Sequence, residues 1–251
     1  MRTIDADVDG EFVRVEPVES DGLRVNGIPA DLAHTRKADV RIDLVEGCKR
    51  CFVAEHVLGP LRLRGITAAN VVGTVETWDF ARPEHRFCYG ADLAPAAVVG
   101  HPEGLPNPAL ADALGSAGIV SNGDRSFGTV SEPLEYSHGG GTIRIEPLDP
   151  GTGVELDLVY GDGSFACTVP PDGADEATID AVTHSTTPYL APSDEEAATH
   201  AVADVLSDVV VIGDLDDVRI EADLGDAYHA LTIGAARRAR ACGAYVERGE
   251  R

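Results

Sequence analysis

Two similar stretches decide the fold that the sequence predicts: Arg14-Val-Glu-Pro-Val-Glu-Ser-Asp-Gly-Leu-Arg-Val25 and Arg144-Ile-Glu-Pro-Leu-Asp-Pro-Gly-Thr-Gly-Val-Glu-Leu156. Each begins with alternating apolar and polar residues, continues through an acidic turn that contains glycine, and ends in a second alternating run. Each stretch therefore predicts a β-hairpin, and the same hairpin is used twice, about 130 residues apart.

The elements expected after each hairpin also correspond. In each half a helix, a strand and a second helix follow in the same order. The predicted pairs are helices 54–63 and 199–212, strands 69–75 and 217–222, and helices 107–117 and 226–241. The sequence thus predicts an α+β protein of two repeated domains. Each is an antiparallel-leaning sheet packed with two helices, and the candidate active site lies in the cleft between them.

The boundary between the predicted domains is near residue 125, so that they span 1–125 and 126–251. The Gly- and Ser-containing stretch 121–128 is the expected linker. The segment 79–106, rich in Pro, His and Gly without a clear period, is the expected long surface loop.

Composition narrows the classes of partner. The chain has 251 residues with 43 acidic and 20 basic side chains, a net charge of −23. Nucleic acids and anionic lipids are bound through Lys and Arg, so neither is an expected partner. Because the acidic residues are scattered, they favour a salt-adapted surface over a site for a cation-rich partner.

The sequence also predicts where the protein is found and the state of its cysteines. The sequence has no apolar run of 18 residues and no signal-peptide layout at its start, which predicts a cytoplasmic protein without membrane insertion. Five cysteines without an export signal are expected to be reduced thiols. The sequence has a single CxxC motif, Cys48 to Cys51. Without a second cysteine pair to complete a metal site, we assign it no function. No sequence feature fixes an oligomeric state.

Polar residues at helical spacing indicate a metal site. His200, Asp204 and Asp208 recur every four residues and form one stripe of the predicted helix. A His and an Asp one turn apart are a sound pair of zinc ligands, whereas the alternative is a solvated helix face. The matching helix of the first half carries Glu55 and His56, a base beside a third ligand, and His229 begins the last helix, a position that suits a catalytic group.

These motifs resemble those of the UDP-3-O-acyl-N-acetylglucosamine deacetylases, the zinc enzymes of lipid A biosynthesis, which are themselves built from two repeated α+β domains. The family's Thr-Val-Glu-His-Leu is similar to Val53-Ala-Glu-His-Val57, and its His-Lys-x-x-Asp-x-x-Gly-Asp-Leu to the run from His200 to Val209. Its Gly-His-Ala-Leu-Asn looks like Tyr228 to Thr232, and its Ala-Arg-Thr-Phe like Ala181 to His184. The similarity runs in order along most of the chain.

The resemblance implies a role for each residue. His56, His200 and Asp204 would hold Zn²⁺, or alternatively Fe²⁺. Glu55 would be the general base, Thr183 would stabilise the oxyanion, and His229, oriented by Asp208, would stabilise charge or protonate the leaving amine. The implied reaction is removal of an N-acetyl group from an amino sugar.

Departures from the family pattern bear on the substrate. Only 16 residues separate Thr183 from His200, so the insert that forms the family's acyl-chain passage is missing. The expected substrate is therefore a smaller N-acetyl sugar, such as a UDP-N-acetylglucosamine derivative without a long acyl chain. The alternative is a noncatalytic sugar-binding or regulatory module that has kept the deacetylase fold.

Overall fold

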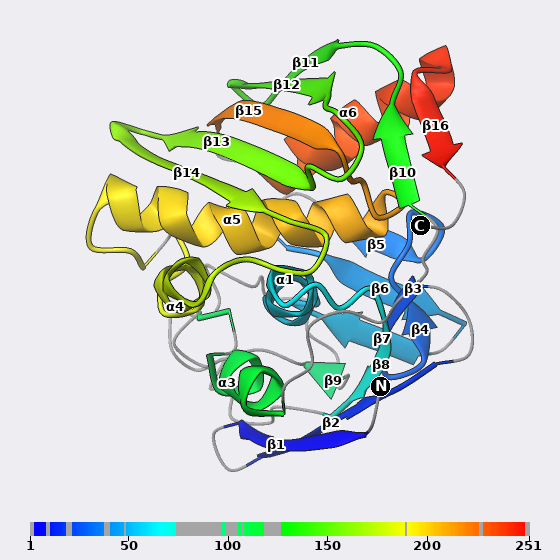
Figure 1. The fold of residues 1–251 in the computed structure, drawn as a ribbon, viewed down its shortest axis with the longest axis vertical. Coiled ribbons are helices and arrows are strands. Elements are labelled where there is room, and N and C mark those ends of the chain that lie inside the picture. Colours follow the sequence, from blue (N-terminus) through cyan, green and yellow to red (C-terminus); the bar gives the residue numbers. More distant parts are fainter. Residues whose placement is uncertain are drawn as a thin grey trace.

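The computed structural model describes residues 3–8, 11–18, 22–37, 41–47, 49–73, 97–98, 105–106, 108–117, 127–188, 190–225 and 228–248. Within these ranges the chain forms five helices and sixteen strands, and the strands make four sheets. The α+β class predicted from the sequence is confirmed (Figure 1).

Two five-stranded sheets dominate the structure. The N-terminal sheet has the order β1-β2-β8-β3-β4, and the C-terminal sheet has the order β11-β12-β15-β13-β14. In chain order the strands of the first are β1 (Ile4–Val8), β2 (Glu11–Glu16), β3 (Gly22–Val25), β4 (Ile28–Pro29) and β8 (Ala68–Val72). Those of the second are β11 (Leu134–His138), β12 (Gly141–Pro147), β13 (Val154–Tyr160), β14 (Gly163–Val169) and β15 (Val218–Leu224).

The two sheets share one pairing scheme. In each, the last strand of the set enters between the second and the third, antiparallel to the second and parallel to the third. The outer pairs, β1 with β2 and β3 with β4, are antiparallel, as are β11 with β12 and β13 with β14. Each sheet is therefore mostly antiparallel, as the sequence predicts.

The predicted hairpins at 14–25 and 144–156 are wrong in their pairing. The two strands of each stretch are present, but β8 separates β2 from β3, and β15 separates β12 from β13. The reason is burial: Val218, Ile220, Ala222 and Leu224 of β15 alternate inward and give this late strand the apolar face of a central strand. A turn pattern specifies a local reversal but leaves open whether a distant strand enters between its arms.

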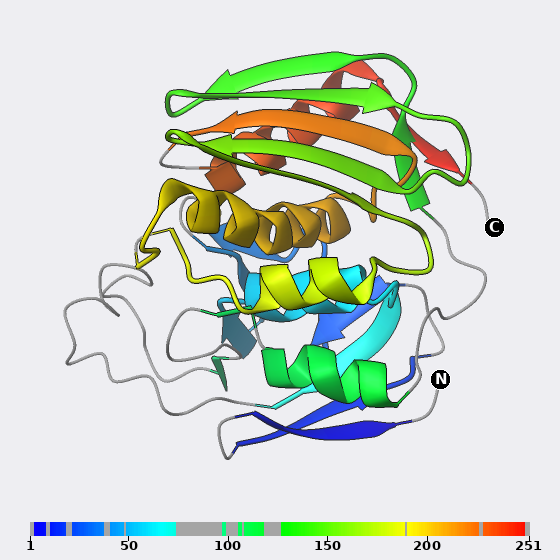
Figure 2. The same cartoon turned by 60° about the vertical axis from the view of Figure 1, so that its left-hand side comes forward.

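Helices lie between the two large sheets, and Figure 2 shows the resulting layers, with α5 and α1 near the middle. The helices are α1 (Glu55–Leu63), α3 (Pro108–Ser116), α4 (Glu176–Thr183), α5 (Asp194–Val211) and α6 (Tyr228–Cys242). α5 packs on β13 and β14, and α6 packs on β11 and β12. α3 packs on β1, and α1 packs against α5 across the middle of the molecule.

Helix α5 begins five residues before the predicted start at 199. Its N-cap is Ser193, whose hydroxyl accepts a hydrogen bond of 3.2 Å from the backbone N–H of Glu196. Three acidic residues in the first turn add favourable interactions with the positive end of the helix dipole. The Ser-x-x-Glu spacing is the signature of a capping box, and it fixes the start of the helix that carries the site.

The remaining strands form two small sheets. One has the order β5-β6-β7-β9, with bounds Thr35–Lys37, Asp43–Glu46, Lys49–Phe52 and Ala97–Val98. The other pairs β10 (Phe127–Val130) with β16 (Tyr245–Arg248). The predicted linker 121–128 is thus wrong for its last two residues, which belong to β10, and its other residues lie outside the described part.

The predicted loop 79–106 lies outside the described residues except for 97–98 and 105–106. Of these, Ala97 and Val98 form β9, paired in parallel with β7, so the prediction of a loop is wrong there. The proposed domain boundary near residue 125 also falls among residues that the structure does not describe.

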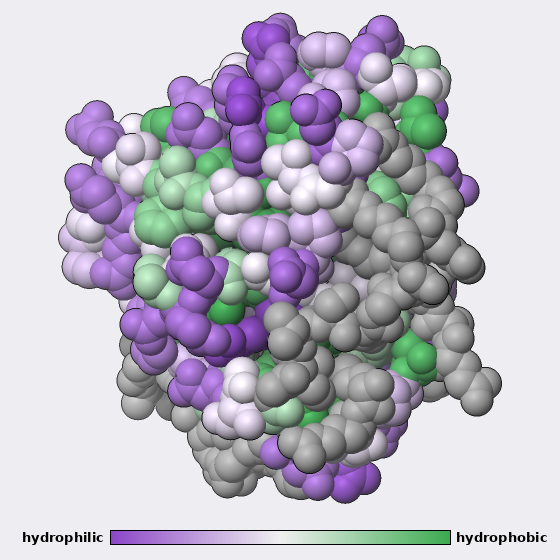
Figure 3. All heavy atoms as spheres, viewed as in Figure 1, coloured by the Kyte–Doolittle hydropathy of each residue, from purple (hydrophilic) through white to green (hydrophobic). Residues whose placement is uncertain are grey.

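The surface of the described residues is mainly hydrophilic on the face that Figure 3 shows. On the face seen in Figure 3, hydrophilic side chains surround small apolar areas. Among the described residues, the exposed large apolar side chains are Val72 and Val246. Within the same residues, no helix is both long and apolar enough to span a bilayer.

Candidate metal centre

Two helices bring the three predicted ligands together. His56 lies in the first turn of α1, and His200 and Asp204 lie one turn apart on α5. One ligand atom from each lies within 4.8 Å of the other two, although His56 and His200 are 144 positions apart in the sequence. The structure therefore assembles one potential metal site from residues of both halves of the chain.

The distances between the ligand atoms match the size of a zinc site. His56 Nε2 lies 3.2 Å from His200 Nε2, and Asp204 Oδ2 lies 3.4 Å from His200 Nε2. Asp204 Oδ1 lies 3.9 Å from His56 Nε2. Zn–N bonds of about 2.0–2.1 Å at tetrahedral angles place two nitrogen ligands roughly 3.3–3.4 Å apart. The imidazole pair fits this spacing without rearrangement of the helices.

The tautomer of His200 supports a cation at this point. Its Nδ1 lies 2.9 Å from the backbone carbonyl oxygen of Ser185, which can only accept, so Nδ1 carries the proton. In a neutral ring Nε2 then presents its lone pair toward His56 and Asp204. A proton can bridge the two imidazoles, and a divalent cation can take its place, because metal ligands bind in their deprotonated forms.

Asp204 is held as an anion inside the protein. Burial opposes its ionisation, but the positive charge and hydrogen bond of His200, with His229 and His56, outweigh burial and hold its pKa below the ordinary value. The hydroxyl of Tyr228 donates to Oδ2 over 2.6 Å. Oδ1 is buried and has no hydrogen-bond partner among the described residues. A buried anionic oxygen of this kind is what a metal ion requires.

His229 and Asp208 form a second pair beside the ligands. His229 Nδ1 lies 3.0 Å from Asp208 Oδ1, and its Nε2 lies 4.0 Å from Asp204 Oδ1. Burial lowers the pKa of His229, but Asp208, then Asp204 and Glu55, raise it to about 10. Burial raises the pKa of Asp208 to about 6, against the effect of His229. At neutral pH the two groups form an imidazolium–carboxylate pair.

Glu55 lies next to His56 at the start of α1. Its Oε2 accepts a hydrogen bond of 2.8 Å from the backbone N–H of Ile42, which fixes one side of the carboxyl group. Burial and the negative charge of Asp204 raise its pKa to about 8, while His229 acts in the opposite direction. A cation at the ligand atoms would favour the ionised form.

Thr183 lies at the end of α4, two residues before Ser185. Its hydroxyl donates over 2.8 Å to the carbonyl oxygen of Ile179 in the same helix. The Thr183 hydroxyl is thus engaged within its own helix, and in this part of the chain it is the carbonyl oxygen of Ser185 that contacts the His200 ring. Of the CxxC pair, Cys51 is buried, and Cys48 lies outside the described residues.

Sequence patterns did not identify two groups that orient the ligands, Tyr228 and the carbonyl of Ser185. A tyrosine at a helix start ordinarily serves in packing, and a backbone carbonyl has no residue signature. Only the neighbouring His229 marked this part of the chain as functional.

A close approach of the two helices makes the histidine contact possible. A Cβ placed on Gly59 of α1 would lie 2.5 Å from the backbone oxygen of Ala203 on α5 and 2.9 Å from its Cα. Gly59 follows His56 by one turn, and Ala203 precedes Asp204. Glycine therefore lets α1 approach α5 closely enough for the imidazoles to meet.

Gly59→Ala is expected to destabilise the protein by about 1–3 kcal/mol, because overpacking against a backbone outweighs the better helix propensity of alanine. Because the added methyl group would push α1 away from α5, metal binding is also expected to weaken. Urea denaturation and metal titration measure the two effects. Gly115→Ala in α3 is the control, since the obstructing atoms there belong to the end of the Arg64 side chain. Unchanged metal affinity in Gly59→Ala would show that metal binding does not depend on the close approach of α1 to α5.

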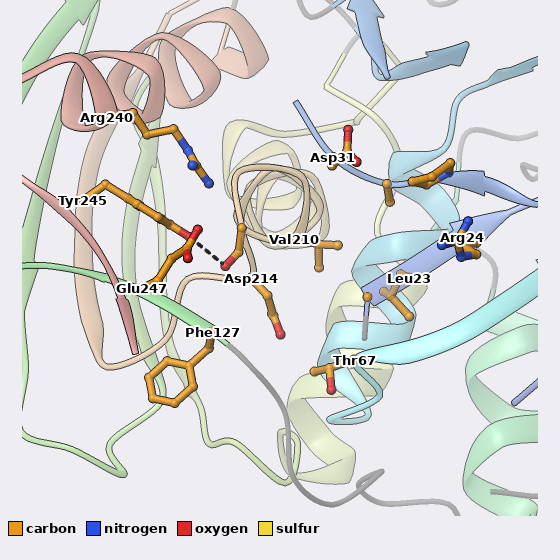
Figure 4. A pocket seen from close by; sticks show the side chains of 14 residues that line it. Leu23, Arg24, Asp31, Thr67, Phe127, Val210, Asp214, Arg240, Tyr245 and Glu247 are labelled. Carbon is orange, nitrogen blue, oxygen red and sulfur yellow. Dashed lines mark hydrogen bonds between the residues drawn. The ribbon is translucent and has the colours of Figure 1, made fainter. Parts of the chain in front are cut away.

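The site is closed to solvent. Each of the seven predicted residues, Glu55, His56, Thr183, His200, Asp204, Asp208 and His229, is at most 2% exposed. A separate cavity of about 570 Å³ opens near the C-terminal end of α5 (Figure 4). Leu23 and Thr67 line one side of it, and Phe127, Arg240 and Tyr245 line the other. As far as the described residues go, its lining contains none of the seven.

Comparison with known proteins adds no family assignment. No model of a known protein family matches the chain, and no curated protein matches it.

Proposed function

We propose that this protein is a zinc-dependent amide hydrolase that removes an acetyl group from an amino sugar. The observation that carries the proposal is the convergence of His56, His200 and Asp204, with matching spacing, on one buried point. The donor set of two imidazoles and one carboxylate is that of many catalytic zinc sites. Fe²⁺ is a second candidate, because the same donors suit it.

A bound zinc ion would supply a Lewis acid for an amide carbonyl and lower the pKa of a water molecule to about 7. Glu55, in its ionised form, takes the proton of the attacking water. The hydrogen bond from the backbone N–H of Ile42 to Oε2 restrains the carboxyl group. Burial, with a smaller contribution from Asp204, raises the pKa of Glu55 and makes its carboxylate a stronger base.

The leaving amine needs a proton, and His229 is proposed to give it. Asp208 engages Nδ1, so the Nε2 proton of the imidazolium faces the ligand side of the site. Thr183 is proposed to stabilise the oxyanion. Since its hydroxyl now donates to its own helix, that role requires the hydroxyl to rotate toward the substrate.

We also infer that the protein consists of two α+β repeats, 1–125 and 126–251, with the site in the cleft between them. The common strand order of the two large sheets supports this division. His56 lies on α1 of the first repeat, and the other two proposed ligands lie on α5 of the second, which supports a site between the repeats.

Burial of the whole site favours a second candidate function, a noncatalytic sugar-binding or regulatory module with a structural metal. Structural zinc sites are closed, whereas catalytic sites keep a position open to water or substrate. For catalysis, the site must open to admit an N-acetyl group.

The test is acetate release by the zinc-loaded protein in high salt, with UDP-N-acetylglucosamine and other small N-acetyl sugars. We expect free acetate and free amine in equal amounts, loss of release with a chelator, and recovery with zinc. If the protein holds one zinc per chain and releases no acetate from any of these sugars, the hydrolase proposal is contradicted and the binding-module function is favoured.

A further inference from the structure

We propose that Tyr228 is a positioning residue that orients the carboxylate of Asp204 toward the metal. The assignment rests on the metal centre proposed above, but it does not depend on whether the centre is catalytic. Tyr228 is the first residue of α6 and is 3% exposed.

The hydrogen bond from Tyr228 is short and directed at one oxygen. The 2.6 Å separation from Asp204 Oδ2 falls in the range of charge-assisted O–H···O⁻ bonds. Because this bond engages Oδ2, the carboxylate plane is fixed and Oδ1 is left facing His56 Nε2 at 3.9 Å and His229 Nε2 at 4.0 Å. The hydroxyl thus holds Oδ2, which also lies 3.4 Å from His200 Nε2. Oδ1 has no hydrogen-bond partner among the described residues and is left for the metal.

Two consecutive residues of α6 contact two carboxylates of α5 that are one turn apart. Tyr228 binds Asp204, and His229 binds Asp208, with the two rings 4.8 Å apart. The start of α6 therefore restrains the α5 carboxylates as a unit. A hydroxyl is the appropriate group beside the proposed ligand Asp204, since it donates a hydrogen bond to the carboxylate and adds no charge that would oppose a cation.

Hydrogen bonds to metal-ligating carboxylates commonly contribute 10- to 100-fold in metal affinity. Tyr228→Phe removes the hydroxyl and keeps the ring that packs at the start of α6. We therefore expect Co²⁺, a spectroscopic substitute for zinc, to bind this variant about 10–100-fold more weakly than the wild type. The visible spectrum of bound Co²⁺ should also change, because the orientation of one ligand changes.

The matched control is Tyr245→Phe. It removes another tyrosine hydroxyl, one that donates over 3.4 Å to the backbone oxygen of Gly213 and lies at the cavity of Figure 4. Its Co²⁺ affinity should stay within about twofold of the wild type, since no metal ligand is touched.

A double-mutant cycle separates positioning from general stabilisation. If Tyr228 acts through Asp204, then adding Tyr228→Phe to Asp204→Asn should change Co²⁺ affinity by less than about twofold. A further tenfold loss in that background would overturn the proposed route. Equal affinity of Tyr228→Phe and the wild type would overturn the role of Tyr228 alone, whereas a wild type that binds no Co²⁺ would overturn the metal centre and this role together.

Discussion

Replacing Glu55 with glutamine is expected to lower the rate of acetate release by about 10²–10⁴-fold while the protein keeps its zinc. Glutamine has nearly the same shape, and its amide oxygen can still accept the hydrogen bond from the Ile42 N–H. The variant cannot take a proton from water. Because Glu55 itself is not a proposed ligand, the metal content should remain that of the wild type. Initial rates and elemental analysis on the same preparation measure both quantities.

The control for Glu55 is Glu155→Gln on β13, where the carboxylate pairs with Arg219 at the surface. It removes one negative charge of the same type away from the metal centre, and its rate should equal that of the wild type. A Glu55→Gln protein that retains zinc and full activity would rule out Glu55 as the base.

Replacing Arg62 with methionine is expected to reduce the free energy of unfolding by about 3–5 kcal/mol. Arg62 lies in the last turn of α1 and is fully buried, with Nη2 3.3 Å from Asp216 Oδ1 and Nε 3.4 Å from Asp214 Oδ1. Both acids follow α5, so this cluster joins the end of α1 to the end of α5. Methionine fills a similar volume but leaves the buried carboxylate of Asp216 without its cation.

Urea denaturation of Arg62→Met beside Arg14→Met provides the comparison. Arg14 pairs with Asp5 at the surface, where an ion pair contributes about 0–1 kcal/mol. A loss for Arg62→Met as small as that for Arg14→Met would show that the buried cluster does not hold the two helices together.

The alignment of the candidate ligands on α5 was predictable because helical spacing is local. His200, Asp204 and Asp208 recur every four residues, and α5 places them on one stripe as that spacing requires. The pairing of that stripe with His56 rested on the correspondence between the two halves, and the structure brings these side chains into contact.

The order of the strands was not predictable from the turn patterns. Both stretches chosen as hairpins contain a strand, a turn and a strand, yet the pairing partner in each case comes from much later in the chain. The true hairpins of the C-terminal sheet turn at Gly139-Gly140 and Gly161-Asp162, with positive φ at each glycine. These are the two-residue turns that glycine favours, and they were the stronger signal.

The buried polar contacts around the ligands depend on tertiary packing. Tyr228 contacts Asp204 because α6 packs beside α5, and Ser185 contacts His200 because the chain after α4 passes the same helix. The glycine contact between α1 and α5 likewise involves residues far apart in sequence. No local pattern encodes such distances.

The most direct test of the central claim is the metal content of the purified protein, compared between the wild type and His200→Ala. If His56, His200 and Asp204 form the centre, the wild type will hold about one zinc or iron per chain. His200→Ala, which has lost one of three protein ligands, will bind the metal too weakly to keep it through purification. A wild type that binds no metal when zinc is offered, or a His200→Ala protein that binds as much as the wild type, would contradict the proposed centre.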